Sequence, residues 1–480
     1  MSVVGFTVGA MTKKTVEFEC VECGWSSPRW AGKCGRCGMW DSLVEVRAGG
    51  RGVGAARGAG GGGGAGIGLG RVATPISAVS SGSVAAWTTG IGEFDRVLGG
   101  GIVPGSVVLL AGEPGVGKST LLLDVAARMA RAGRTVLYAT GEESAEQVRM
   151  RAERIGAVDP GLLLATSNDL QEVVGHIEAV KPELVLVDSV QTLSAAGIEG
   201  AAGGVSQVRG VASALVEVAK SRGVAVVLVG HVTKDGSVAG PRSLEHIVDV
   251  VCSFDGERHT EVRLLRASKN RFGPAEEVGC FTLAEDGIHE VADPSGLFAQ
   301  LGCDPVPGNC LGISMEGRRP MAVEVQALAV SSSAASPRRT TSGVDSSRLA
   351  MVLAVLQRRC GVTFGSQDVY ASTVGGARVC EPGMDLAVAL ACASGRFDVP
   401  IPPGTCAIGE VGLGGEVRPV RGLDRRLAEA ARLGLRRALV PDSEVAWGRL
   451  VPGELDVVRV SSLQGAVSAV LAGEEVRVGR

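Results

Sequence analysis

The stretch VVLLAGEPGVGKSTLLLDVAARMA, residues 107–130, constrains this 480-residue chain more than any other. An apolar segment ends at Ala111, the spacing G-x4-G-K-S runs from Gly112 to Ser119, and apolar residues then recur at helical spacing. A strand, a glycine-rich loop and a helix in this order predict a P-loop, whose backbone amides cradle phosphates. The predicted nucleotide-binding residues are Gly112, Glu113, Pro114, Gly115, Val116, Gly117, Lys118, Ser119 and Thr120.

Two side chains of this loop carry its chemistry. Lys118 is predicted to reach the β- and γ-phosphate oxygens, and the hydroxyl of Ser119 to bind Mg²⁺. The expected cofactors are therefore ATP and Mg²⁺. Three further apolar segments follow in TVLYATGEES, ELVLVDSVQ and VAVVLVGHVTKDG, which predicts a parallel α/β sheet.

Acidic residues end two of these segments. Asp188 has the position of a Walker B aspartate and is expected to hold Mg²⁺ through water. Glu142 is expected to polarise the attacking water, and Glu143 is the other candidate for this role. Alternatively, Glu142 is a helix N-cap residue whose charge is stabilised by the helix dipole. His231 ends the third segment, where it either senses the nucleotide state or has only a structural role.

Four of the twelve cysteines are clustered near the N-terminus in CVECGWSSPRWAGKCGRCG. Two C-x2-C pairs separated by ten residues predict a closed, tetrahedral and purely structural zinc site. A module this small needs the metal to fold. The predicted ligands of this one Zn²⁺ are Cys20, Cys23, Cys34 and Cys37.

The segment LLRASKNRFGP places two cations at the end of an expected hairpin strand. A basic turn is often merely solvated. However, Lys118 is the one cation identified near the γ-phosphate, and many P-loop ATPases receive another from a neighbouring subunit. Lys269 and Arg271 are therefore candidates for fingers that act in trans.

Taken together, the C4 cluster, GEPGVGKST, AGPRSLEHIVD and KNRFG resemble the bacterial RadA (Sms) family of DNA recombination and repair ATPases. The resemblance covers nearly the whole chain apart from a glycine-rich linker, and KNRFG is highly specific to the family. It implies a RecA-like core in a hexameric homo-oligomeric ring. It also implies ATP-driven movement on single-stranded DNA, branch migration of recombination intermediates, and the RecA recombinase as a partner. The family motif maps to Lys269, Asn270, Arg271, Phe272 and Gly273.

The DNA-binding surface must be local, because the net charge of −3 gives no overall basic field. In the implied ring, the loops after Asp188 and His231 would face the channel, where each basic residue is repeated around the ring. The candidate DNA contacts are Arg209, Lys234 and Arg242.

The region from about Leu297 resembles the proteolytic domain of Lon. In CEPGMDLAVALACASG, Gly383 stands where the resemblance implies a nucleophilic serine, and Asp424 stands where it implies a lysine base. A Ser–Lys dyad needs a hydroxyl activated by an amine, so no active protease is expected. The domain is interpreted as a ring-forming and DNA-contacting scaffold. Its edge arginines either contact DNA or only solvate the surface: Arg418, Arg421, Arg425 and Arg426.

The predicted fold class is α/β. The predicted domains are a C4 zinc ribbon (1–46), a flexible Gly/Ala-rich linker (47–85), a RecA-like P-loop ATPase (86–296) and a Lon-protease-like α/β domain without its dyad (297–480). No membrane span is expected, and the scattered cysteines suit a reducing cytoplasm. The alternative function is a RecA-like regulatory or signalling ATPase without DNA translocation.

Overall fold

The computed structural model describes residues 17–20, 26–27, 33–37, 39, 43–46, 75–78, 85–231, 241–256, 261–300, 304–333, 336–443 and 455–471. Two compact units make up the chain, Met1–Ser80 and Ser81–Arg480. Among the described residues, no helix is long and apolar enough to cross a membrane.

The first unit contains a small antiparallel sheet with the strand order β2-β1-β3. Strand β1 lies in the middle, so that its last residue, Cys20, is buried. The elements of this unit are β1 (Glu17–Cys20), β2 (Ser26–Ser27), β3 (Leu43–Val46) and the short helix η1 (Ile76–Ala78).

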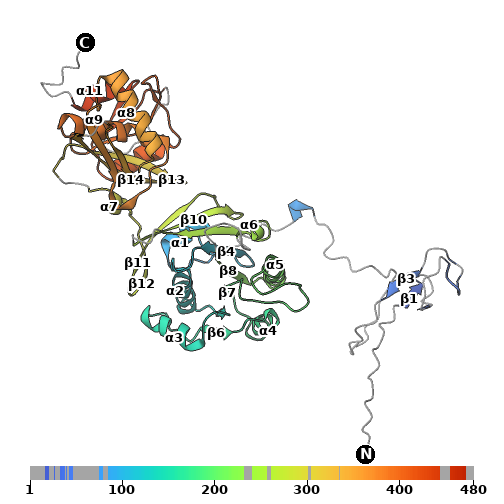
Figure 1. The fold of residues 1–480 in the computed structure, drawn as a ribbon. Helices are drawn as coiled ribbons and strands as arrows, with labels where there is room; N and C mark the ends of the chain where they lie inside the picture. Colours follow the sequence, from blue (N-terminus) through green and yellow to red (C-terminus); the bar gives the residue numbers. More distant parts are fainter. Residues whose placement is uncertain are drawn as a thin grey trace, which may run out of the picture. The chain divides into compact units, whose positions relative to one another are not determined.

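The second unit begins with a nine-stranded sheet of order β12-β11-β10-β9-β4-β8-β7-β5-β6 (Figure 1). Its six strands from β9 to β6 in that order are mutually parallel, and the other three extend the sheet antiparallel. Its elements are α1 (Gly92–Leu98), β4 (Val107–Gly112), α2 (Lys118–Arg131), β5 (Val136–Thr140), α3 (Ala145–Arg154), β6 (Leu162–Thr166), α4 (Leu170–Val180), β7 (Leu184–Asp188), α5 (Val205–Arg222), β8 (Ala225–His231), α6 (Pro241–Leu244), β9 (Val250–Asp255), β10 (Val262–Asn270), β11 (Val278–Ala284) and β12 (Gly287–Glu290).

The central strands are buried on both faces, as continuous apolar runs predict. In β4, Val108 and Leu110 pack in one core with α1, α2 and α3, whereas Val107 and Leu109 pack in a second core with α4 and α5. Because successive strand residues point to opposite faces, this alternation fixes a three-layer arrangement of helices on either side of the sheet.

The parallel strands bring their carboxyl ends to one edge of the sheet. The loops that follow β4, β5, β7 and β8 therefore meet there, which is where open α/β sheets bind ligands. The last residue of β4, Gly112, pairs with His231, and the last residue of β5, Thr140, pairs with Asp188.

Strand β10 runs in the opposite direction. Asn270 pairs with Val250, and Val250 pairs with Val108 at the start of β4. Since Val108 is four residues before Gly112, the end of β10 lies about 13 Å from the P-loop edge along the strand direction. The KNRFG motif therefore begins at the edge of the sheet opposite to the P-loop of the same chain.

The C-terminal domain is built on a seven-stranded mixed sheet of order β15-β16-β14-β13-β17-β20-β21, and β18 pairs separately with β19. Helices α8, α9 and α11 contribute to a core on one face, and α10 to a second core against β13, β17 and β20. The elements are α7 (Ser295–Phe298), β13 (Asn309–Glu316), β14 (Arg319–Ser331), β15 (Arg339–Ser342), α8 (Ser346–Cys360), β16 (Gln367–Thr373), η2 (Val374–Gly376), η3 (Pro382–Met384), α9 (Asp385–Phe397), β17 (Thr405–Ala407), β18 (Glu410–Val411), β19 (Val417–Arg418), α10 (Leu423–Arg432), β20 (Arg437–Pro441), β21 (Asp456–Val460) and α11 (Leu463–Leu471).

Candidate nucleotide site and the KNRFG motif

The P-loop connects β4 to α2 in the predicted way. Gly115 and Gly117 have φ values of 80° and 107°, in the left-handed region that favours glycine. The ammonium of Lys118 folds back on the loop and donates to the carbonyl oxygens of Gly112 and Glu113 at 2.8 and 2.9 Å. Burial lowers the pKa of Lys118, and the nearby carboxylates of Asp188 and Glu142 oppose that shift.

Glycine at two positions of the loop is also required by packing. A Cβ at Gly112 would lie 2.3 Å from the carbonyl oxygen of Phe254, and one at Gly117 would lie 2.8 Å from Ile288. The β11–β12 hairpin, which carries Ile288, therefore packs directly on the phosphate loop.

The Walker B carboxylate has a partner that the sequence analysis missed. The hydroxyl of Tyr138, on the neighbouring strand β5, donates to Oδ2 of Asp188 at 2.6 Å. Burial and then the charge of Asp188 raise the pKa of Tyr138 well above its usual range, so the phenol keeps its proton. Oδ1 of Asp188 has no hydrogen-bond partner within the described part of the chain, which leaves it available to a magnesium-bound water.

The two adjacent glutamates after β5 point to different partners. Glu142 accepts a hydrogen bond from Ser189 Oγ at 2.9 Å and lies 3.2 Å from Nε2 of His231. Glu143 instead forms an ion pair with Arg151 of α3. Glu142 therefore belongs to the cluster formed by the ends of β7 and β8, which favours it over Glu143 as the residue that activates water.

The loop after β7 has an internal anchor. The buried amide of Gln207 accepts from the backbone of Ala195 at 3.0 Å and donates to the carbonyl of Ile198 at 2.6 Å. Arg209 lies two residues further along α5 and is exposed. Of the other two candidate DNA contacts, Arg242 lies in α6, and Lys234 lies outside the described residues.

The residues of the KNRFG motif divide into two groups. Asn270 donates to the carbonyl of Leu98 at 3.1 Å and so caps the end of α1, while a Cβ at Gly273 would lie 3.1 Å from the Cα of Gly99. These two residues hold the motif against its own subunit. Phe272, by contrast, is 42% exposed.

The two cations of the motif make their contacts far from the P-loop. Lys269 donates to the carbonyl oxygens of Glu245 and Val248 at 2.5 and 2.8 Å. Arg271 lies 3.2 Å from Oδ1 of the buried Asp249, whose Oδ2 accepts from Lys220 at 2.6 Å. Asp249 was not identified from the sequence as a functional residue, although it lies in the quoted AGPRSLEHIVD segment.

Three of the four predicted zinc ligands lie together. The Sγ atoms of Cys20, Cys34 and Cys37 are within 4.8 Å of one another, and those of Cys20 and Cys37 are 3.6 Å apart. Sulfurs at about 2.3 Å from a tetrahedral Zn²⁺ are about 3.8 Å apart, so this donor set fits the metal. The backbone N–H of Cys37 lowers the pKa of the Cys34 thiol, which favours the thiolate. Cys23 lies outside the described residues.

The expected protease site of the C-terminal domain is filled by a side chain. A Cβ at Gly383 would lie 3.0 Å from Nη1 of Arg426, which forms an ion pair with Glu381 at 2.6 Å. The prediction that Arg426 lies on a basic edge is therefore wrong: it is 1% exposed, because Glu381 and the carbonyl of Ile313 pair with it inside the domain. Asp424, at the position where the Lon resemblance implies a lysine, is exposed.

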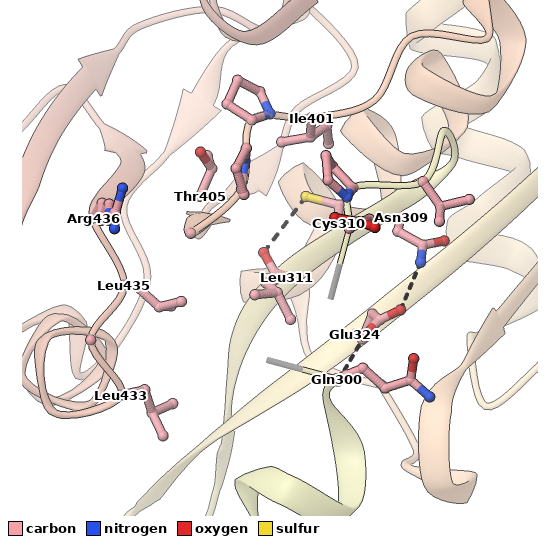
Figure 2. A pocket seen from close by; sticks show the side chains of 17 residues that line it. Gln300, Asn309, Cys310, Leu311, Glu324, Ile401, Thr405, Leu433, Leu435 and Arg436 are labelled. Atoms are coloured by element: carbon pink, nitrogen blue, oxygen red, sulfur yellow. Dashed lines mark hydrogen bonds between the residues drawn. The ribbon is translucent and has the colours of Figure 1, made fainter. Parts of the chain in front are cut away.

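A separate groove of about 560 Å³ lies on the same domain, between β13, β17 and the turn before β20. Figure 2 shows Glu324 at its floor, accepting from Asn309 Nδ2 at 2.8 Å and from the Gln300 N–H at 2.9 Å. Gln326 donates to the same carboxylate at 2.8 Å. Since these donors already satisfy Glu324, its carboxylate has little remaining capacity to bind a ligand in the groove.

The fold and these sites define an AAA-type P-loop ATPase with an N-terminal zinc ribbon. The AAA domain family matches residues 84–237, and the family described as a rubredoxin metal binding domain matches residues 18–45. DNA repair protein RadA of Mycolicibacterium smegmatis is 50% identical over 467 residues, which cover 96% of this chain and 98% of that protein. DNA repair protein RadA of Mycobacterium tuberculosis (48%; 95% and 93% covered) and that of Bacillus subtilis (41%; 96% and 100% covered) are also similar.

The chain belongs to the RadA family of DNA repair proteins. The predicted family and the α/β fold class, with zinc ribbon and P-loop core, are thereby confirmed.

The two adjacent glutamates provide a matched pair of variants. If Glu142 is the expected base, Glu142→Gln should reduce ATP turnover about 10²–10⁴-fold, because it removes the carboxylate that orients water. Glu143→Gln should reduce turnover less than about tenfold, because its carboxylate is paired with Arg151. Steady-state hydrolysis, with nucleotide binding measured in parallel, checks this. A larger loss in Glu143→Gln would reverse the assignment.

Restoring a serine at the protease position should harm the domain. Gly383→Ser places a Cβ 3.0 Å from the Arg426 guanidinium. This overpacking should lower the free energy of unfolding by about 1–3 kcal/mol. Gly365→Ser is the matched control, since a Cβ there meets nothing within 4 Å. Thermal unfolding measures the difference, and a casein assay should show no proteolysis by any of the proteins. Equal stability of the two variants would contradict the described packing.

Proposed function

We propose that this protein is a DNA-dependent ATPase of recombinational repair, a ring-shaped motor on single-stranded DNA that promotes branch migration of recombination intermediates. One observation carries the proposal. Lys269 and Arg271 lie at the sheet edge opposite to the P-loop of their own chain. They are too distant to contact a nucleotide bound at that P-loop. In a ring of identical subunits, however, the edge that carries these two cations can face the nucleotide of the next subunit.

Within one subunit, each residue of the nucleotide site has a role that fits its surroundings. The P-loop amides and Lys118 would hold the phosphates of ATP, and Ser119 and Asp188 would hold Mg²⁺. Glu142 orients the attacking water. The bound Mg²⁺ supplies neutralisation of the phosphate charge. Lys269 and Arg271 of the adjacent subunit supply further positive charge to the γ-phosphate, where Lys118 is the cation identified in the same subunit.

The DNA contact is proposed at the loops that leave the carboxyl edge of the sheet. The exposed Arg209 lies near the start of α5 at this edge, and the segment that contains Lys234 leaves it directly after His231. His231 lies 3.2 Å from Glu142. DNA held by the segment after β8 would thus lie close in sequence to His231, which contacts Glu142, so the proposal predicts that single-stranded DNA stimulates hydrolysis.

The remaining parts of the proposal concern the flanking domains and partners. The cysteine module holds one structural Zn²⁺, and the C-terminal domain is a ring-forming scaffold rather than a protease. The RecA recombinase is the proposed protein partner, by family resemblance. A regulatory ATPase without DNA translocation is the alternative, and single-stranded DNA that fails to stimulate hydrolysis would favour it.

Complementation between two inactive subunits tests the trans role. A Lys118→Ala subunit has a defective pocket but intact fingers, and a Lys269→Ala/Arg271→Ala subunit has the reverse. Each alone should lose about 10³–10⁵-fold in DNA-stimulated turnover. Mixing them before ring assembly should restore turnover well above both, because some interfaces combine the two intact halves.

Co-assembly of the two variants must be demonstrated, for example by co-purification through a tag on one of them. If the mixed rings form and hydrolyse ATP no faster than the separate variants, the fingers do not act in trans.

Metal analysis tests the cysteine module. The purified protein should contain one zinc per chain, and Cys34→Ser should release it because a three-sulfur site binds far more weakly. The control is Cys380→Ser, at an exposed cysteine of the other unit, which should keep its zinc. Retention of a full complement by Cys34→Ser would refute the assignment.

A further inference from the structure

The KNRFG motif lies in a connection whose closing residue has an unusual backbone. Glu276 donates its N–H to the carbonyl of Ala267 at 2.8 Å and thereby closes residues 268–275, here called the KNRFG loop, which comprise the last residues of β10 and the turn that follows it. Its φ is +69°. Lys181 and Asp398, the other described non-glycine residues with positive φ, are C-caps of helices, where this conformation is common. Glu276 has no such helix end, so its conformation must be held by its neighbours.

The neighbour that holds it comes from the C-terminal domain. Arg318, at the tip of the β13–β14 hairpin, donates its backbone N–H to the carbonyl oxygen of Glu276 at 2.9 Å. The approach requires Gly317, because a Cβ there would lie 2.1 Å from the same oxygen. Gly317 also has a φ of +58°. The tip of one domain is thus shaped to fit the strained residue of the other.

The same hairpin is fixed by a buried ion pair. Arg319 pairs with Glu93 of α1, and both side chains are almost fully buried. The guanidinium also donates to the carbonyls of Val278 at 3.2 Å and Ala292 at 2.8 Å. Helix α1 is therefore bound at its start by the hairpin and at its end by Asn270 of the motif.

We propose that the β13–β14 hairpin tip, residues 316–319, is a positioning element for the KNRFG loop, so that the C-terminal domain sets where Lys269 and Arg271 are presented to the next subunit. The contact at Glu276 fixes the base of the loop, and the Arg319–Glu93 pair fixes the helix against which the loop rests. This inference rests on the proposed trans role of the two cations. It assigns the C-terminal domain a function in the ATPase site that needs no catalytic residue of its own.

Hydrogen exchange of the full-length protein tests the positioning directly. In Gly317→Ala, amides of residues 268–276 should exchange about tenfold faster, because the closing residue loses its support. Gly434→Ala is the matched control. It lies in the same domain, has a φ of +73° and would place its Cβ in open space, so it carries the backbone strain without the contact. Unchanged exchange in Gly317→Ala, or equal acceleration in both variants, overturns the proposal.

A second variant keeps the test decisive if Gly317→Ala does not assemble. Arg319→Lys keeps the charge and the backbone but loses the forked contacts to Val278 and Ala292. It should produce the same local acceleration of exchange, and an unchanged exchange rate contradicts the proposal.

Subunit mixing tests the functional consequence. Gly317→Ala alone should lower DNA-stimulated hydrolysis at least about tenfold, and mixing with Lys118→Ala subunits should restore it, as for the finger variant. A general folding defect would not be rescued in this way. If the Lys269→Ala/Arg271→Ala subunits are rescued and Gly317→Ala is not, this inference fails alone. If neither is rescued, the trans role fails, and hydrogen exchange still decides whether the hairpin supports the loop.

Discussion

The buried carboxylate of Asp249 connects the strand that leads to the P-loop with the KNRFG motif. One of its oxygens accepts from the backbone of Val107, the first residue of β4, at 3.0 Å, and from Lys220 at 2.6 Å. The other lies 3.2 Å from Arg271. A buried charge is tolerated when several donors satisfy it. The strand that leads to the P-loop and the motif at the opposite edge of the sheet therefore share one buried carboxylate as a common contact.

The contacts of Asp249 bear on the proposal that one subunit supplies the P-loop and the next supplies Lys269 and Arg271. The buried strand β4 separates the phosphate loop from the KNRFG cations, and Asp249 contacts the start of that strand as well as Arg271. In the proposed ring, Arg271 of one subunit would have to leave or share Asp249 in order to meet a phosphate. The charge of Lys220 would then remain beside Asp249, so the carboxylate would not be left uncompensated.

Local patterns predicted the P-loop, the Walker B strand and most of the cysteine cluster, because each is encoded within a short segment. The contacts that orient these groups join residues far apart in sequence. Tyr138 reaches Asp188 across fifty positions, and Glu93 reaches Arg319 across more than two hundred. Nothing in the local sequence of Tyr138 distinguishes it from a core residue. The same limit explains the error at Arg426, because its neighbours Arg418, Arg421 and Arg425 suggested a basic edge, although its partner, Glu381, lies forty-five residues earlier.

The guanidinium of Arg426 occupies the space beside Gly383, the position at which the resemblance to Lon implies a nucleophile. With glycine at position 383, the space that a serine side chain would use is taken by a guanidinium, and Glu381 and Ile313 satisfy that guanidinium inside the domain. Position 383 is therefore part of a packed interior. Overpacking at such a position typically costs about 1–3 kcal/mol, so the stability of the domain opposes a serine at position 383. A domain rigidified in this way can present the hairpin 316–319 in a fixed position, and the proposed role in positioning the KNRFG loop requires rigidity and no catalysis.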